Sequence, residues 1–230
     1  MVLGILPAFF AGLFAVAQAA MVIEETPLPP KVAAFLSATK EHPPVDEALE
    51  RIRKNVVPAL RQLAANRDLI KALRAHNAAR MTLTAAEIRG LERDWRNAVA
   101  TRDWRRLEAI LGTPASEALR TALEQDGLAS ARLYLSDNRN LLTAATTPVG
   151  TFELGDWGGW RRIYMSSPET AFIETTDQAD GYGFYRVEIG VWDPEQGEAI
   201  GTLIAEIPWE AASQPRRNEA TSSTSADHRN

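Results

Sequence analysis

The spacing of apolar residues changes near residue 130, and this change constrains the fold more than any other feature of the sequence. Before it, apolar residues recur at three- and four-residue steps, which is the spacing of an amphipathic helix. After it, apolar and polar residues alternate, as they do in half-buried strands. We therefore expect an α+β fold in which an N-terminal helical segment (45–127) precedes a five-stranded antiparallel sheet (128–210).

The helical segment contains several predicted helices. One apolar stripe runs through Val45, Leu49, Ile52, Val56, Leu60 and Leu63, and Ile70 and Leu73 continue it toward Asn77. Pro58 lies inside this stripe, where it either kinks one long helix or occupies the first turn of a second. Thr84 and Glu87 have the spacing of a capping box, which predicts the start of another helix. Pro114 predicts the start of the last helix, which we expect to end near Gly127.

The second half is predicted to hold five strands joined by turns. The expected strands are 131–135, 141–146, 171–175, 185–191 and 199–207. The turn sequence Asp193-Pro194-Glu195-Gln196-Gly197 predicts that the last two strands form an antiparallel hairpin. The glycine-rich stretch from Gly155 to Gly159 is predicted to be a turn, because it lacks the Lys-Ser/Thr of a phosphate-binding loop.

The N-terminus resembles an export signal. Residues 2–20 are apolar except for Gln18, and Ala17-Gln18-Ala19 has the small-residue spacing of a cleavage site. We therefore expect residues 1–20 to be a signal peptide and the protein to be periplasmic or secreted. A membrane anchor and a buried core helix are the alternatives, and the first basic residue is only Lys31, whereas a signal peptide normally begins with a basic segment.

Two further segments are predicted to lack regular structure. Residues 21–44 include three closely spaced prolines and are expected to be a linker. Residues 211–230 are polar and rich in serine and threonine, which predicts a disordered tail.

The composition excludes several kinds of chemistry. The chain has no cysteine, so disulfides, thiol catalysis and cysteine-based metal sites are excluded. Its three histidines, His42, His76 and His228, have no metal-ligand spacing. The sequence contains no nucleophile elbow, phosphate-binding loop or dinucleotide fingerprint. We therefore expect no enzymatic activity, no metal and no cofactor.

Charge is distributed unevenly along the chain. Residues 46–106 carry a net charge of +6, and residues 107–210 carry −11. An anionic partner for the first half is one interpretation, and solvated helix faces with interleaved charges are the favoured one. The combined aromatic and basic surface of a nucleic-acid-binding protein is not concentrated anywhere, so we expect no nucleic-acid partner.

Several motifs in residues 73–207, about 60% of the chain, resemble the PDC-type (Cache) sensor domains, whose sheet is PAS-like. The matching residues are Ala75-His76-Asn77; Thr84, Glu87, Ile88, Leu91, Glu92 and Trp95; the hairpin from Leu133 to Leu142; Gly155-Asp156 and Trp160; Glu174 to Asp177; and Val187 to Asp193 with Gly197, Ile200 and Gly201. The sequence departs from the family pattern at Thr151, Phe152, Leu154 and Trp157. The resemblance implies a five-stranded sheet with a ligand pocket on one face.

The predicted site is the segment from Phe152 to Tyr164 facing the fourth strand. Its candidate ligand-binding residues are Asp156, Trp160, Arg161, Tyr164, Asp177, Tyr185 and Arg186. Aromatic side chains with polar tips are typical of small-ligand pockets, arginines bind carboxylates, and aspartates bind amines. The alternative is that the tryptophans fill the core and Asp156 caps a turn.

Two functional hypotheses follow. The first is an exported domain that senses or binds a small amine or carboxylate and passes its signal to a membrane-bound partner, since no output module is recognised in the sequence. The second is an exported interaction or structural protein that keeps the sensor fold with a degenerate pocket. The departures from the family pattern are the basis of the second hypothesis.

Overall fold

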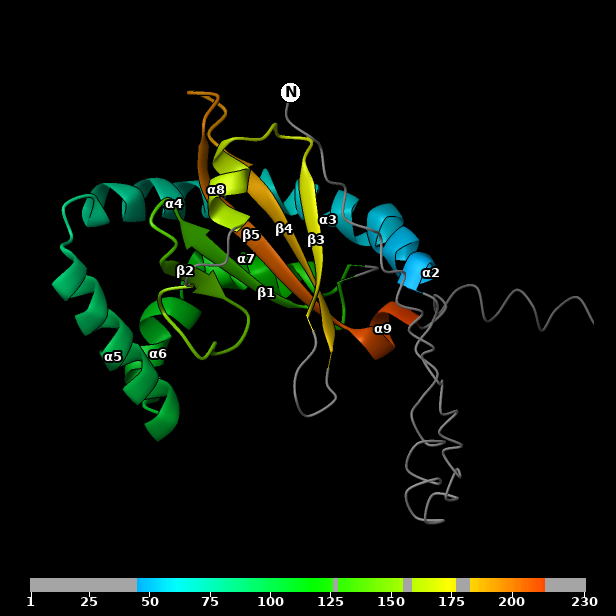
Figure 1. The fold of residues 1–230 in the computed structure, drawn as a ribbon. Coiled ribbons are helices and arrows are strands. Elements are labelled where there is room, and N and C mark those ends of the chain that lie inside the picture. Colours follow the sequence, from blue (N-terminus) through cyan, green and yellow to red (C-terminus); the bar gives the residue numbers. More distant parts are fainter. Residues whose placement is uncertain (1–44, 126–127, 155–158, 177–182, 214–230) are drawn as a thin grey trace, which may run out of the picture. The chain divides into compact units, whose positions relative to one another are not determined.

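The computed structural model describes residues 45–125, 128–154, 159–176 and 183–213. The predicted signal peptide and linker and nearly all of the predicted tail lie outside these residues. Within them, a run of helices precedes the sheet, so the predicted α+β order is confirmed (Figure 1). No helix in these described ranges is long and apolar enough to cross a membrane.

Seven helical elements lie within the described residues 45–125. They are α2 (Val45–Arg51), the π-helical η1 (Ile52–Val56), α3 (Val57–Ala64), α4 (Arg67–Arg80), α5 (Ala85–Thr101), α6 (Trp104–Leu111) and α7 (Pro114–Ala122). Pro58 lies in the first turn of α3, directly after the π-helical turn in which the Val57 amide donates to the Ile52 carbonyl. The backbone keeps helical angles at Arg51, Val56 and Val57, so the proline follows a π-helical turn within one helical run and does not open a separate helix.

The predicted apolar stripe is interrupted where the sequence suggested continuity. Asn66 leaves the helical conformation, and its side chain accepts a hydrogen bond from the Asp68 amide, which caps α4. The expectation that the stripe continues toward Asn77 without a break is wrong, because this cap starts a separate helix. The capping box at Thr84 and Glu87 and the start at Pro114 are confirmed.

The sheet has five antiparallel strands. They are β1 (Arg132–Asp137), β2 (Leu142–Ala145), β3 (Ala171–Thr176), β4 (Phe184–Trp192) and β5 (Ala199–Pro208). Their order in the sheet is β2-β1-β5-β4-β3, as expected for a PAS-like sheet (Figure 1). The hairpin between β4 and β5 is confirmed, and Gly197 closes its turn with a φ of 69°.

Two short helices were not predicted. The first, α8 (Gly159–Tyr164), follows the glycine-rich stretch, and the second, α9 (Trp209–Ser213), follows β5. The prediction of a turn reaching Gly159 is therefore wrong at that residue, because Gly159 begins a helix. Six residues are too few to show a helical period in the sequence.

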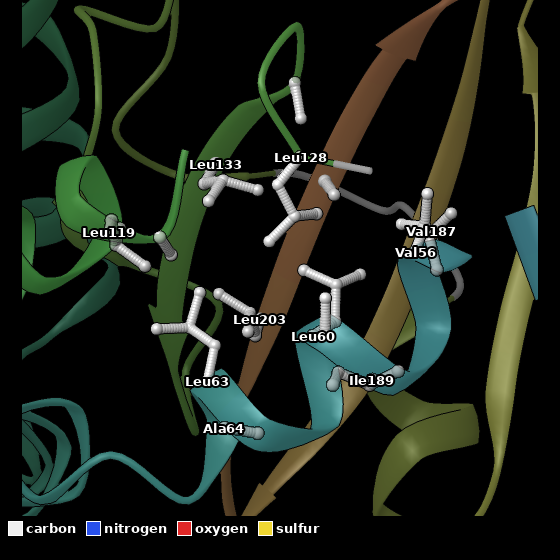
Figure 2. Close-up of a cluster of buried hydrophobic side chains, with 14 of the residues drawn as sticks. Val56, Leu60, Leu63, Ala64, Leu119, Leu128, Leu133, Val187, Ile189 and Leu203 are labelled. Carbon is white, nitrogen blue, oxygen red and sulfur yellow. The ribbon is translucent and has the colours of Figure 1, made fainter. Parts of the chain in front are cut away.

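The main hydrophobic core lies between one face of the sheet and the helices α3, α4 and α7 (Figure 2). The strand residues in this core are Leu133, Leu135, Tyr185, Val187, Ile189, Val191, Leu203, Ala205 and Ile207. Leu60 and Leu63 of α3 are packed against them. Gly201 allows α4 to approach closely, since a Cβ there would lie 2.6 Å from a methyl carbon of Leu73. We call this face of the sheet the helix-covered face.

A second cluster joins α5 and α6 to β1 and β2. It contains Ile88, Trp95, Leu107 and Ile110 from the helices, and Tyr134, Leu141, Leu142, Phe152, Leu154 and Ile204 from the sheet side. Two residues of the predicted helical stripes are not buried in it. Leu91 is 37% exposed and Trp104 is 60% exposed.

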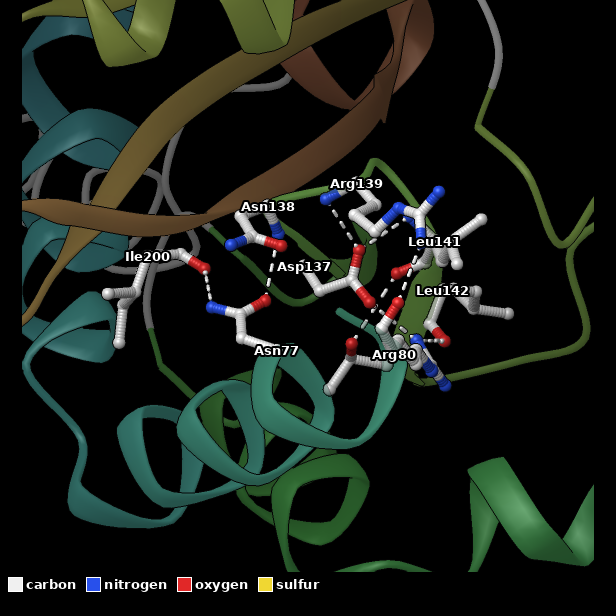
Figure 3. Close-up of polar contacts among 9 residues, drawn as sticks. Asn77, Arg80, Asp137, Asn138, Arg139, Leu141, Leu142 and Ile200 are labelled. Atoms are coloured by element: carbon white, nitrogen blue, oxygen red, sulfur yellow. Dashed lines mark hydrogen bonds and ion pairs between the residues drawn. The ribbon is translucent and has the colours of Figure 1, made fainter. Parts of the chain in front are cut away.

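A buried carboxylate connects α4 to the β1–β2 turn (Figure 3). Asp137 accepts hydrogen bonds from Nη1 of Arg80 at 2.8 Å and from the amides of Arg139 and Leu141 at 2.9 Å each. Arg139 donates in turn to the carbonyl oxygens of Arg80 and Leu83. The end of α4 and the turn are therefore held together by charge as well as by packing.

Asn77 forms a second connection from α4. Its Nδ2 donates to the carbonyl oxygen of Ile200 at 2.8 Å, and its Oδ1 accepts from the Asn138 amide at 3.0 Å (Figure 3). One side chain thus satisfies backbone groups of β5 and of the β1–β2 turn. These two hydrogen bonds explain the asparagine at this position of α4.

We predict that Asp137→Asn lowers the free energy of unfolding by about 3 kcal/mol, because it leaves the buried Arg80 guanidinium without its counter-charge. Urea denaturation monitored by circular dichroism measures this change. Asp94→Asn, on the exposed face of α5, is the matched control and should change stability by less than about 0.5 kcal/mol. Equal effects of the two substitutions would contradict a stabilising role for the buried ion pair.

The β4–β5 hairpin is tied to the middle of α4 by Arg74. The Nε and Nη2 atoms of Arg74 bind the two carboxylate oxygens of Asp193 at 2.8 and 2.6 Å. Arg74 also binds Glu195, and the amides of Glu195 and Gln196 donate to Asp193. The hydrogen bond from Arg74 lowers the pKa of Asp193 from 3.8 to about 2.

We predict that this carboxylate contributes to acid stability. Because the pKa of Asp193 is lower in the folded state, its contribution is fully present above pH 3.8 and is lost as the pH falls toward about 2. Stability measured by urea unfolding across this range should fall more steeply for the native protein than for Asp193→Asn. Parallel pH profiles would contradict the prediction.

Candidate functional site

The second face of the sheet carries polar residues, and we call it the polar face. Tyr185 and Val187 of β4 lie in the core on the helix-covered face. Since side chains alternate along a strand, Arg186 and Glu188 lie on the polar face. Both are nonetheless buried, with 6% and 3% of their surface exposed. Buried charges need compensation and are typical of functional sites, so this face is the candidate site.

A row of alternating charge crosses four strands of the polar face. The strand register places Glu174 opposite Arg186, Arg186 opposite Glu206, and Glu206 opposite Arg132. Opposite charges facing each other across strands stabilise a sheet. We call these four residues the charge row.

Glu206 is held by two partners. Its Oε2 lies 2.8 Å from Nη2 of Arg132, and its Oε1 accepts the hydroxyl hydrogen bond of Tyr134. Burial, together with the nearby negative charge of Glu206, raises the pKa of Tyr134. The tyrosine therefore stays protonated and acts as a donor.

Arg186 of the charge row also forms an ion pair with Glu188, which lies two residues further along β4. Nε of Arg186 is 2.5 Å from Oε1 of Glu188. Burial raises the pKa of Glu188 although Arg186 acts in the opposite direction. The second oxygen of this carboxylate, Oε2, is buried and accepts no hydrogen bond from the described part of the chain.

Two hydroxyl groups on the polar face are also buried without a hydrogen-bond partner in the described part of the chain. Ser136 and Thr202 are opposite each other on β1 and β5, and both are buried. Their oxygens have no hydrogen-bond partner among the described residues. Buried polar atoms are normally satisfied, so this part of the face has hydrogen-bonding capacity that the described chain does not use.

An open cavity of about 550 Å³ lies over the charge row. All four row residues line it together with Tyr134. Its remaining lining is Pro148, Val149, Gly150, Thr151, Thr176 and Phe184. This volume is in the range of small-molecule sites, and the lining offers two cations and two carboxylates.

Helix α8 packs on the same face. Arg162 forms an ion pair with Glu174, and its guanidinium lies 4.8 Å from the ring centroid of Phe172. Ile163 packs over Gly190, where a Cβ would lie 3.1 Å from the isoleucine Cγ2. The absence of a side chain at Gly190 therefore lets α8 approach the sheet.

The structure separates the predicted site residues. Arg186 lines the cavity, whereas Tyr185 lies on the opposite face, where its ring centroid is 6.5 Å from that of Trp209. The expectation that these two residues share one pocket is therefore wrong, because neighbours in a strand face opposite sides. Tyr164 lines a different groove, beside Trp192.

The other predicted residues belong to α8 or to segments that are not described. Arg161 is exposed on α8. Trp160 belongs to α8, but only its backbone is among the described parts of the structure. Asp156 and Asp177 also lie outside the described residues. Their roles as ligand-binding residues stay predictions.

The candidate site residues taken from the sequence did not include Arg132, Tyr134, Glu174, Glu188 and Glu206. A signal for some of them was present, because the alternation in β4 places Glu188 on the same face as Arg186. The hairpin turn also fixes the register that brings Glu206 opposite Arg186. No group of three or more acidic or histidine residues with metal-binding geometry occurs in the described ranges.

No protein-family model and no curated protein matches this chain. Among solved structures, it is similar to the extracellular domain of vpHK1S-Z8, described as a histidine kinase, with a TM-score of 0.36 and 12% identity over 79% of this chain. It is also similar to the sensor domain of the V. cholerae histidine kinase DctB, with a TM-score of 0.32 and 13% identity over 66% of this chain. In each case the alignment spans 57% of the other structure.

Proposed function

We propose that the polar face binds a small ligand that carries both a positive and a negative group, such as an amino acid, and that the protein acts as a sensing or binding domain. The observation that supports this most directly is the charge row beneath a cavity of about 550 Å³. Packing alone does not require the buried charges of Arg186, Glu188 and Glu206 that this face carries beside its apolar residues.

The charges of the cavity support a zwitterionic ligand. Arg132 and Arg186 can bind a carboxylate, and Glu174 and Glu206 can bind an ammonium group. A ligand with a single charge would leave one pair of row residues without a new partner. A zwitterion complements the alternating pattern and leaves the total charge of the site unchanged.

The buried Arg186–Glu188 pair supports the specificity of the proposed ligand binding. Such a pair adds little net stability, because removing both charges from water offsets their attraction. The ion pair with Glu188 does, however, hold the guanidinium of Arg186 in place on the polar face. We infer that Glu188 orients Arg186 for ligand binding rather than contacting the ligand through its bonded oxygen.

Export and a membrane-bound signalling partner are the remaining parts of this proposal. They are supported by the apolar N-terminus and by the sequence resemblance to sensor domains. The domain would then bind its ligand outside the cytoplasm and transmit the bound state through contact with the partner.

One observation favours the interaction-protein alternative. Trp104, at the start of α6, is 60% exposed, and Arg102 and Arg105 beside it are exposed as well. Tryptophan and arginine are the residues most enriched at binding hot spots between proteins. This surface lies on α5 and α6, so it does not require the cavity.

We predict that zwitterionic amino acids stabilise the protein in a thermal-shift screen, by about 2.7 kcal/mol at 100 times the dissociation constant. Simple carboxylates of similar size should stabilise it less. Arg132→Gln and Glu174→Gln should each weaken binding roughly tenfold, because each removes one charge-assisted hydrogen bond. Their side chains are about half exposed, so the fold should persist.

Arg89→Gln is the matched control, since this arginine is exposed on α5 away from the cavity lining. It should bind the ligand as the native protein does. A screen without any stabilising ligand would reject the proposal and leave the interaction surface at Trp104 as the better explanation. Equal loss of binding in all three variants would show that the charge row is not the site.

A further inference from the structure

A second groove lies at the hairpin end of β4 and shares no lining residue with the cavity over the charge row. Its volume is about 810 Å³. Four elements form it: α4, the β1–β2 turn, α8 and the β4–β5 hairpin. We call it the hairpin groove, and its lining includes Arg74, Tyr164, Trp192, Asp193, Glu195 and Glu198.

The walls of this groove are held in place by contacts within the protein. Arg74 binds both oxygens of Asp193 and also reaches Glu195, which fixes the hairpin to α4. Asn77 joins β5 to the β1–β2 turn on the other side (Figure 3). A groove built in this way is formed before a ligand arrives, which lowers the entropy lost on binding.

The groove has excess negative charge. Arg74 is the one basic residue among its described lining residues, which include three carboxylates, those of Asp193, Glu195 and Glu198. Arg74 and two backbone amides already engage Asp193. Glu198 is exposed and has no ion pair within the described ranges. An uncompensated carboxylate on a concave surface attracts cations.

Two aromatic residues also line the groove. They are Trp192 from β4 and Tyr164 from α8. Burial, with a contribution from the charge of Asp137, raises the pKa of Tyr164, so its ring stays neutral. The Trp192 indole lies against Gly190, whose missing side chain gives it room, because a Cβ there would be 2.6 Å from the indole nitrogen.

We propose that this groove is a second binding site, for a small organic cation such as a primary amine. Its ammonium group binds near Glu198 and Glu195, and its apolar part packs against Trp192 and Tyr164. Aromatic faces and carboxylates together are the usual recognition chemistry for such cations. A carboxylate ligand of the same length is repelled by the two glutamates.

The indole N–H of Trp192 provides a direct measurement of this site. The chain has six tryptophans, so a nitrogen–proton NMR spectrum of the labelled protein shows a small set of indole signals. The signal that disappears in Trp192→Phe belongs to Trp192. The native protein is then titrated with n-butylamine and, at equal ionic strength, with n-butyrate.

The proposal predicts a saturable shift of the Trp192 signal with n-butylamine and none with n-butyrate. Glu198→Gln should weaken the apparent affinity for n-butylamine about two- to fivefold, the range expected for an exposed ion pair. Glu169→Gln removes an exposed carboxylate outside the groove and should leave the affinity unchanged.

The proposal is overturned if n-butylamine leaves the Trp192 signal in place, or if n-butyrate shifts it equally. Equal weakening by Glu198→Gln and Glu169→Gln would also overturn it, because it would indicate general charge attraction. Indole signals that stay dispersed in each variant show that the fold is intact. The test does not depend on a ligand at the charge row, since the two sites have no lining residue in common.

Discussion

The sheet is buried on both faces, and one of these faces carries buried charges beside its apolar residues, so these charges must be compensated within the fold. Arg186 and Glu188 lie in the middle of β4 with 6% and 3% of their surface exposed. They pair with each other, and Arg186 lies opposite Glu174 and Glu206 on the neighbouring strands. This compensation requires the register of the strands to be kept, because a one-residue slip would move each charge into the apolar core.

Helix α4 maintains the geometry around the groove at the β4–β5 hairpin and the cavity over the charge row. From one helix, Arg74 fixes the β4–β5 hairpin, Asn77 reaches β5, and Arg80 binds the buried carboxylate of Asp137. The close packing of Leu73 on Gly201 brings the helix near enough for these contacts. The hairpin groove is formed directly by them. The charge row depends on them indirectly, since β5 carries Glu206 and is anchored through Ile200.

Patterns with a local physical cause were predictable. The capping box at Thr84, the helix start at Pro114 and the hairpin turn at Asp193–Gly197 each follow from groups a few residues apart, and each is confirmed. The break at Asn66 and the helix at Gly159 were missed. The apolar residues keep their helical spacing on both sides of Asn66, so the spacing alone did not indicate the helix cap there. The helix that begins at Gly159 is stabilised by packing on the sheet rather than by its own six residues.

The sequence by itself determined the order of helices and strands, because periodicity reflects which side of each element is buried. It also determined that Arg186 and Glu188 share a face, since alternation along a strand is a property of the backbone. Only the tertiary structure decided which side chains meet them. The charge row joins residues from four strands, and the hairpin groove joins α4 to α8, and such contacts depend on sheet order and helix packing. That is why Tyr185, adjacent to Arg186 in the chain, lies in a different part of the molecule.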